Sequence, residues 1–324
     1  MSRLAKFCWG VLIYNVLVIL WGAYVRATGS GAGCGSHWPL CNGEVIPRPH
    51  SLETLIEFTH RATSGLALLA VLAMFIWAFR AYPRRHIVRL GASLSLLFII
   101  TEALVGAALV LFEWVAHNIS FARAISMPLH LANTFLLLAA LTLTAWWASG
   151  GASFRLRGQG KLLQVLAGGV FAMLVTGMTG AVIALGDTLT LGLGIAPEQS
   201  PLVRTLVLLR PIHPVIAVLA GVYLSTAGIW VLNHRPQPLV SRLVMILMML
   251  FVFQLIAGAI NVVLKAPVWL QLIHLLLSDM IWIVLVLFSA AALASQEVPA
   301  RESAVMSPTA PVQSEGVRNC WLNG

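Results

Sequence analysis

Long apolar segments constrain the fold of this chain more than any other feature. The hydrocarbon core of a bilayer is about 30 Å thick, and an α-helix needs roughly 20 residues to cross it. Hydrophobic residues make up 59% of the 324 residues and charged residues only 10%, which is typical of membrane proteins with several spans. Backbone polar groups in lipid must be satisfied within the segment, so we expect α-helices. The sequence predicts eight of them, near residues 7–25, 61–80, 88–112, 127–148, 161–185, 212–232, 242–264 and 270–294.

Positive charges are distributed unevenly between the segments that connect these helices. With the N-terminus placed inside, the short inner segments hold eleven Lys and Arg residues and the outer segments hold seven. This bias follows the positive-inside rule and predicts that both termini are cytoplasmic. The formal net charge of +9 is therefore interpreted as a topology signal, and no nucleic-acid partner is expected.

The two ends of the chain lead to separate expectations. The N-terminal sequence MSRLAKFCWGVL resembles the charged part of a signal peptide. However, the apolar run after it is too long and lacks a small-residue cleavage site, which predicts a retained helix. No Arg- and Ser-rich presequence is seen, which favours a bacterial inner membrane. Residues 296–324 have no periodicity and are predicted to form a disordered cytoplasmic tail.

Two of the four cysteines lie in the first predicted outer loop, GSGAGCGSHWPLCNG. The outer side is oxidising, so we expect a disulfide between Cys34 and Cys41. Free thiols, metal-binding thiols and a redox-active pair are the alternatives.

The sequence contains a weak internal repeat. GAYVRATG at 22–29 parallels GAVIALGD at 180–187, and TEALVGA at 101–107 parallels FQLIAGA at 253–259. Each half has four helices, so both halves have the same orientation, as in parallel repeats. The repeat predicts two four-helix bundles, formed by residues 1–150 and 151–295.

Four of the nine histidines recur at matching positions of this repeat. They are expected near the starts of even-numbered helices, at a similar depth in the outer part of the membrane. Any one of them could be a hydrogen-bonded helix-end residue, but ionisable groups in membrane segments tend to mark functional sites. Imidazole pairs from facing helices suit axial ligation of haem better than a tetrahedral zinc site. The four are His60, His130, His213 and His274.

Several motifs make the chain resemble the heme A synthase family, to about residue 294. They are VRATGSGAGCGSHWPLCNG at 25–43, EFTHRATSG at 57–65, PLHLANT at 128–134, RPIHP at 210–214 and LIHLLLSD at 272–279. The resemblance implies eight helices in two halves, with a haem b cofactor in the C-terminal half and the substrate haem O in the N-terminal half. His213 and His274 would then bind the cofactor iron, and His60 and His130 would face the substrate.

The activity implied by the resemblance is oxidation of a methyl group of haem O to a formyl group, through successive hydroxylations. The product, haem A, serves terminal oxidases. The implied partners are an unidentified electron donor, haem O synthase and terminal oxidase assembly factors. Two other functions fit paired histidines: a diheme b-type electron-transfer or quinol oxidoreductase protein, and a haem transporter or chaperone.

The two halves differ in charge beside equivalent histidines. Alignment of His60 with His213 places Glu57 opposite Arg210. Arg210 is suited to bind a haem propionate. Glu57 is better suited to proton transfer or to setting the state of His60; alternatively, it is an acid favoured by the helix dipole in a first turn. Arg26 is predicted to contact a propionate or anchor the loop, or to be an interfacial arginine.

Two further acids lie within predicted spans. Glu102 pairs with Gln254 in the repeat, and Asp279 lies five residues beyond His274, off the ligand face. Each is expected either to join a proton path or to form an interhelix hydrogen bond.

Overall fold

The computed structural model describes residues 1–48, 51–154 and 157–294, and residues 1–294 belong to one compact unit. Its described residues form eight segments that are long and apolar enough to cross a membrane. They form no strand and only two isolated bridges, Cys41 to Glu44 and Phe154 to Ala294. The predicted all-α membrane fold with eight spans is confirmed. The predicted tail at 296–324 lies outside the described residues.

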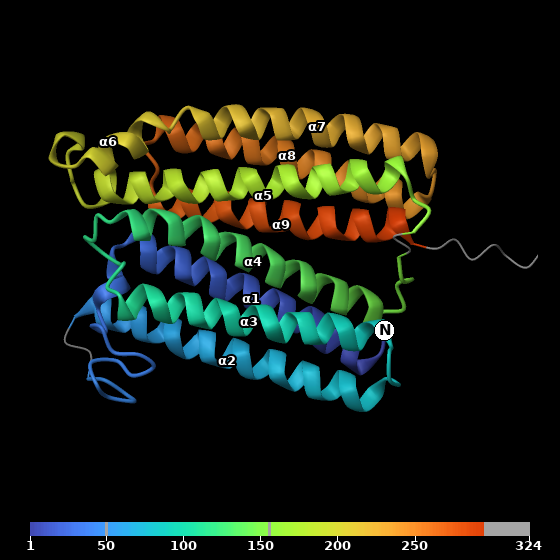
Figure 1. The fold of residues 1–324 in the computed structure, drawn as a ribbon, viewed down its shortest axis with the longest axis horizontal. Coiled ribbons are helices and arrows are strands. Elements are labelled where there is room, and N and C mark those ends of the chain that lie inside the picture. Colours follow the sequence, from blue (N-terminus) through green and yellow to red (C-terminus); the bar gives the residue numbers. More distant parts are fainter. Residues whose placement is uncertain (49–50, 155–156, 295–324) are drawn as a thin grey trace, which may run out of the picture. The chain divides into compact units, whose positions relative to one another are not determined.

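Figure 1 shows the long helices lying side by side. The sixth span consists of a short helix, α6, and a longer one, α7, separated by a turn that contains Arg210 and Pro211. A π-helical turn, Thr188–Gly192, follows α5. The helices are α1 (Arg3–Ala27), α2 (Leu52–Ala81), α3 (Ile87–Leu111), α4 (Phe121–Ala148), α5 (Lys161–Asp187), α6 (Pro201–Leu208), α7 (Ile212–His234), α8 (Pro238–Val263) and α9 (Val268–Leu293).

Two helices begin earlier than the sequence predicted. The hydroxyl of Ser51 accepts a hydrogen bond from the backbone N–H of Thr54 and caps α2, and Ser120 caps α4 in the same way. His60 is therefore the ninth residue of α2, about 12 Å from its start. His60 and His130, expected near the beginning of their helices, lie in the first half of α2 and α4, further in than the apolar runs indicated, because serine caps extend both helices. Glu57 likewise lies beyond the first turn, which removes the helix-dipole explanation for it.

The contacts between helices divide the eight spans into two sets of four. In the first set, α1 and α3 each pack against α2 and α4, which places α2 diagonally opposite α4. In the second, α5 and α8 each pack against α9, and α7 packs between α5 and α8. This places α7 diagonally opposite α9. The parallel repeat and the boundary at residue 150 remain predictions.

The two sets meet where α4 packs against α5 and α9 and where α1 packs against α9. The indole Nε1 of Trp282 in α9 donates a hydrogen bond of 2.6 Å to the backbone oxygen of Phe135 in α4. The two rings stack with their centroids 4.8 Å apart. A Cβ atom on Gly177 of α5 would lie 2.8 Å from the Phe135 ring, so the glycine allows this close approach. We call these three residues and their contacts the seam.

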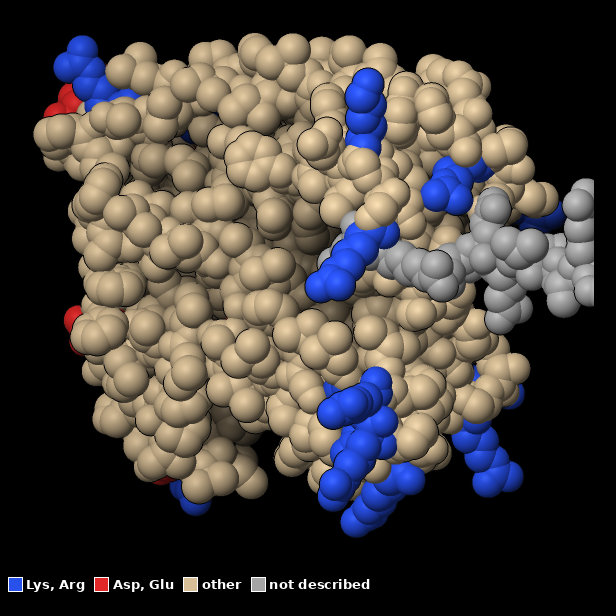
Figure 2. Space-filling model, turned by 45° about the vertical axis from the view of Figure 1, so that its right-hand side comes forward, with Lys and Arg blue, Asp and Glu red and all other residues tan. Residues whose placement is uncertain are grey.

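Lys and Arg side chains gather at the end of the helices where the N-terminus lies (Figure 2). This distribution is the one that the positive-inside rule requires of a cytoplasmic end. Which side of a membrane this end occupies stays a prediction. The basic residues in the described helix ends and turns there are Arg3, Lys6, Arg80, Arg84, Arg85, Arg89, Arg157, Lys161, Arg235 and Arg242.

Candidate functional site

His213 of α7 and His274 of α9 form a close pair, the C-terminal histidine pair. Their ring centroids are 6.5 Å apart and the ring planes are at 80°. When two imidazole rings bind the same metal ion from opposite sides, with metal–nitrogen bonds of about 2 Å, their ring centres lie roughly 6 Å apart. The spacing of this pair therefore suits a metal ion held between the two rings.

Polar groups on neighbouring helices contact both rings of the C-terminal pair. Nδ1 of His213 lies 3.1 Å from the hydroxyl of Thr179 in α5. Nε2 of His274 lies 3.2 Å from the amide nitrogen of Gln254 in α8. Nδ1 of His274 and Oε1 of Gln254 are buried without a hydrogen-bond partner among the described residues. Buried polar atoms are seldom left in this state, so the pair is suited to a bound group that would reorganise these contacts.

His60 of α2 and His130 of α4 form the N-terminal histidine pair, on the other set of diagonal helices. Nδ1 of each ring is buried, and neither has a hydrogen-bond partner within the described part of the chain. Nδ1 of His130 lies 3.5 Å from Oε1 of Glu102 in α3. This distance is slightly too long for a good hydrogen bond.

Glycines give room to three of the four imidazoles. A Cβ atom would lie 2.9 Å from Cε1 of His60 if added to Gly22, 3.0 Å from Cε1 of His213 if added to Gly180, and 3.1 Å from Cε1 of His274 if added to Gly258. Gly22 and Gly180 are equivalent in the predicted repeat. Together with the unpartnered ring nitrogens, these glycines fit axial imidazole ligation of a haem.

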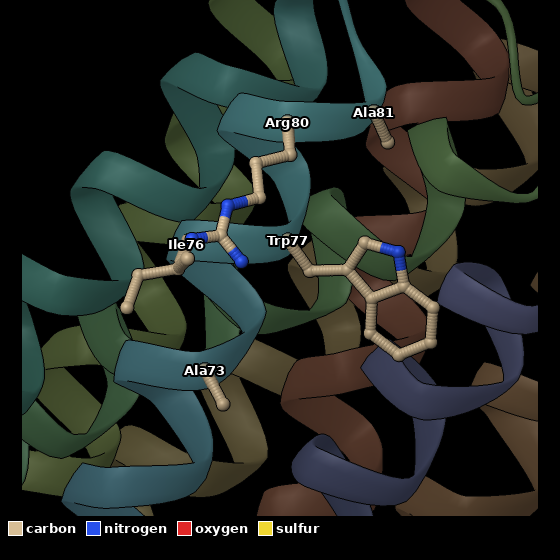
Figure 3. Close-up of a pocket in the computed structure, with 5 residues that line it drawn as sticks. All are labelled: Ala73, Ile76, Trp77, Arg80 and Ala81. Atoms are coloured by element: carbon tan, nitrogen blue, oxygen red, sulfur yellow. The ribbon is translucent and has the colours of Figure 1, made fainter.

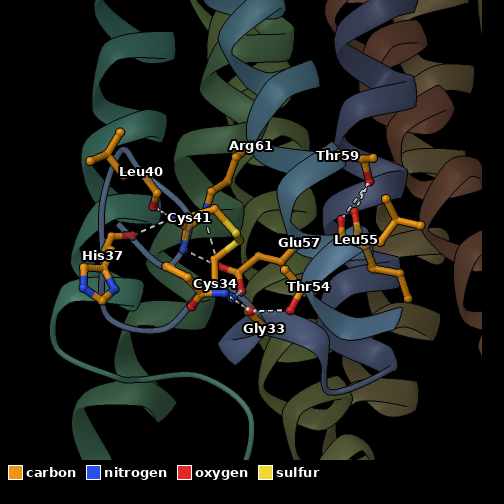
Figure 4. The surroundings of a disulfide bond; sticks show 12 residues. Gly33, Cys34, His37, Leu40, Cys41, Thr54, Leu55, Glu57, Thr59 and Arg61 are labelled. Atoms are coloured by element: carbon orange, nitrogen blue, oxygen red, sulfur yellow. Dashed lines mark hydrogen bonds and ion pairs between the residues drawn. A yellow bond between two sulfur atoms is a disulfide. The ribbon is translucent and has the colours of Figure 1, made fainter. Parts of the chain in front are cut away.

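The carboxylate of Glu57 faces the first loop and is only 3% exposed. Its Oε2 accepts a hydrogen bond of 2.8 Å from the backbone N–H of Cys34. Its Oε1 accepts a bond of 3.1 Å from Nε of Arg61, which also forms an ion pair with it through Nη2. Both carboxylate oxygens of Glu57 are therefore engaged (Figure 4).

Arg61 extends this attachment along the loop. Its Nη1 donates to the backbone oxygens of His37 and Leu40, at 2.5 and 2.6 Å. The hydroxyl of Thr54 donates to the backbone oxygen of Gly33 at 2.7 Å. We call Thr54, Glu57 and Arg61 the loop anchor. Sequence reasoning missed Arg61, although its spacing of four residues from Glu57 on a helix indicates an ion pair.

The loop that the anchor holds contains a disulfide. Cys34 and Cys41 are bonded (Figure 4), as the sequence predicted. The bond closes a short stretch of chain, so all four backbone contacts of the anchor lie within or directly beside one small ring.

The two arginines predicted to contact propionates have protein partners. Nη1 of Arg26 donates to the backbone oxygen of Ala184 at 2.8 Å and to Thr188, and its Nη2 donates to Gln271 of α9 at 3.0 Å. Arg26 thus connects α1 with the other set of helices. The propionate contact of Arg26 stays a prediction.

Nη2 of Arg210 forms an ion pair of 2.7 Å with Asp187 and donates to Thr190 at 2.6 Å. Its Nε is buried and has no partner among the described residues. Sequence reasoning missed Asp187, which closes the GAVIALGD segment. The propionate contact of Arg210 also stays a prediction.

The two acids within the spans differ in their surroundings. Glu102 of α3 accepts hydrogen bonds from Asn133 and Thr134 of α4. It therefore forms the interhelix hydrogen bond that was one of its two expected roles. Asp279 is fully buried, and neither of its carboxylate oxygens has a partner in the described ranges.

A surface pocket lies on α2, near its C-terminal end (Figure 3). Ala73, the lining residue nearest in sequence to His60, is roughly 20 Å from it along the helix. The pocket contains none of the predicted site residues and is not part of the site. Its lining residues are Ala73, Ile76, Trp77, Arg80 and Ala81.

Fold and site together define a multi-pass helical membrane protein with two diagonal pairs of partly buried histidines. A model of the COX15-CtaA family, described as cytochrome oxidase assembly protein, matches residues 5–286. The chain belongs to this family.

Individual relatives agree with this assignment. A heme A synthase of Geobacillus kaustophilus is 30% identical over 285 residues, which cover 85% of this chain and 87% of that protein. A heme A synthase of an Exiguobacterium species is 39% identical over 112 residues, 35% of this chain and 37% of that protein. A Thermus thermophilus protein named protoheme IX farnesyltransferase is 58% identical over 300 residues, 90% of this chain. The chain spans only 49% of the length of that relative.

Proposed function

We propose that this chain is a heme A synthase, which oxidises a methyl group of haem O to a formyl group. One observation carries the proposal: two diagonal pairs of partly buried histidines occur in a chain that matches a heme A synthase over 85% of its length. The class of enzyme follows from the substrate, because the conversion of a methyl to a formyl group is an oxidation.

The four histidines divide the work in this proposal. His213 and His274 would hold a resident haem b, for which their 6.5 Å ring separation is suitable. This group would supply electron transfer to the reaction site. His60 and His130 would bind the haem O substrate, and the glycine beside His60 leaves space for the imidazole. The oxidation also needs an oxidant that accepts electrons from the methyl group, and an electron donor; neither would come from the described residues.

The partner that makes the substrate follows from its chemistry. Haem O carries a long isoprenoid tail, so an enzyme that alkylates haem must precede this one. The Thermus relative is named protoheme IX farnesyltransferase, and this chain matches about half of it. We propose a functional association with a haem O synthase and with terminal oxidase assembly, in a bacterial inner membrane with both termini cytoplasmic.

Expression of the chain with haem O supplied tests the activity. The reaction runs under aerobic, reducing conditions, and the haems are then extracted and separated by chromatography. Heme A synthase activity gives haem A. Recovery of haem O and haem b alone would reject the proposal and favour an electron-transfer or transport protein.

Glu57 is proposed to assist proton transfer at the N-terminal site or to set the state of His60. Its two oxygens accept hydrogen bonds from Cys34 and Arg61, so Glu57 could instead serve to hold the loop. The two roles predict different yields of haem A in the variants below. Glu57→Gln should lower haem A yield sharply while the C-terminal haem stays bound. Thr54→Val is the matched control, because it removes another loop contact and leaves the carboxylate. An equal loss in both variants assigns Glu57 to loop anchoring, and normal yield in Glu57→Gln rejects a catalytic role.

A further inference from the structure

We propose that Glu102 is a positioning residue that acts through His130 and makes the N-terminal haem site the more electron-rich of the two. The inference rests on the proposed function, in which His130 binds the substrate haem. In this inference, Glu102 makes the substrate haem differ in electron density from the electron-transfer haem, and it does so through His130 rather than by contact with either haem.

The contact between Glu102 and His130 leaves the ligating nitrogen free. Oε1 of Glu102 lies 3.5 Å from Nδ1 of His130, and Nδ1 has no hydrogen-bond partner among the residues described. An imidazole that binds iron through Nε2 carries its proton on Nδ1. A small movement would then bring Nδ1–H into a hydrogen bond with the carboxylate. Carboxylates in this place orient a metal-binding histidine and raise its basicity.

The Glu102 carboxylate is held in position by the same helix that carries the histidine. Asn133 and Thr134 lie three and four residues after His130 and donate to Oε2 and Oε1, at 2.5 and 2.6 Å. Asn133 is itself oriented by the hydroxyl of Thr101 at 2.7 Å. The carboxylate therefore has little freedom to turn away from the imidazole.

The C-terminal pair lacks this arrangement. Gln254 stands at the position of Glu102 in the predicted repeat, and its amide contacts Nε2 of His274 rather than Nδ1. A neutral amide carries no charge to increase the basicity of a ligand. Nδ1 of His213 lies beside the uncharged hydroxyl of Thr179. Neither C-terminal histidine has a carboxylate within the hydrogen-bond and ion-pair contacts described for it.

The expected consequence is a difference in reduction potential. A more basic imidazole, with a carboxylate behind it, stabilises the oxidised form of bound iron. The haem at the N-terminal pair should then have a lower potential than it would have with an amide at position 102. A role of Glu102 in packing α3 against α4 alone predicts no such dependence on charge.

The full-length protein loaded with haem O and haem b is titrated by spectroelectrochemistry. Glu102→Gln should raise the potential of the N-terminal haem and leave the C-terminal haem unchanged. Thr134→Val should shift the same potential in the opposite direction, because it frees one carboxylate oxygen for His130. Shifts of the same sign in both variants, or no shift in either, would overturn the inference.

Two further outcomes are decisive. If Glu102→Gln fails to bind a haem at the N-terminal pair, Thr134→Val decides alone: a lower potential supports the inference, and an unchanged or higher potential overturns it. A wild-type protein that binds a single haem overturns the proposed function together with the inference. Opposite shifts without haem A formation would reject the proposed function but retain the role of Glu102.

Discussion

The N-terminal and C-terminal histidine pairs occupy corresponding places but differ in what surrounds them. The N-terminal pair has the Glu102 carboxylate beside one ring, and the helix of the other ring carries the loop anchor. The C-terminal pair has neutral Thr179 and Gln254 beside its rings. Residues 151–294 contain no cysteine that could form an equivalent disulfide. Because both pairs offer the same two side chains, we expect the neighbours of the histidines to set any difference in their chemistry.

The largest expected effect concerns which haem each histidine pair binds. His274→Ala should remove bound haem b, because one of the two imidazoles that hold it is lost. The loss of affinity should exceed the roughly 10- to 100-fold change seen when only a residue behind a metal ligand is removed. His60→Ala should retain haem b and lose haem O binding. Haem content of the purified variants measures both, and loss of haem b in His60→Ala would contradict the division.

A second prediction tests the space that Gly22 leaves for the imidazole of His60. Gly22→Ala should lower haem O occupancy, since the new Cβ atom would lie 2.9 Å from Cε1 of His60 and displace the ring. Gly106→Ala is the matched control, because no described atom lies within 4 Å of its Cβ position. The control should keep full occupancy and gain about 1 kcal/mol of helix propensity. Equal occupancy in both variants would show that His60 tolerates displacement.

A third prediction concerns the disulfide, which occurs in the N-terminal half and should contribute to the thermal stability of the protein. Cys34 and Cys41 are separated by seven residues, and closure of so short a ring stabilises the fold by roughly 2 to 3 kcal/mol in the chain-entropy model. Cys34→Ser with Cys41→Ser should lower the thermal midpoint while haem b stays bound. Differential scanning fluorimetry in detergent, with haem spectra recorded in parallel, measures both quantities. Loss of haem b in this variant would mean that the loop supports both pairs.

The smallest expected effect concerns the connection between the halves. Arg26→Gln removes hydrogen bonds to α5, the π-helical turn and α9. Interhelical hydrogen bonds in membranes contribute about 0.6 kcal/mol each, so the loss should be about 1 to 2 kcal/mol. The same decrease in thermal midpoint with and without bound haem would support a connecting role. A decrease confined to the haem-loaded protein would support the predicted propionate contact instead.

The sequence predicted the number and type of helices because apolar length is a local property. It placed the histidines correctly in four different spans but located two helix starts too late, because Ser51 and Ser120 extend the helices into polar sequence. The pairing of Cys34 with Cys41 followed from their nearness in one loop.

The contacts between distant residues were harder to predict. The repeat alignment placed Glu102 opposite Gln254, but it could not show that each contacts a histidine of the next helix through a different ring nitrogen. The partners of Arg26 lie 158 to 245 residues away, and no local pattern encodes such contacts. Side-chain direction within a bundle depends on the packing of all its helices.

The contacts of the loop anchor with residues 33–41, the stretch around the disulfide, are all to backbone atoms. Thr54, Glu57 and Arg61 contact the Gly33, His37 and Leu40 carbonyls and the Cys34 amide. Such an attachment does not depend on the side chains that the loop carries. The side chains of His37 and Leu40 can therefore be exchanged for a reporter group while their backbone carbonyls stay available to Arg61. The loop thus offers a rigid position for labelling this protein on a surface next to its N-terminal site.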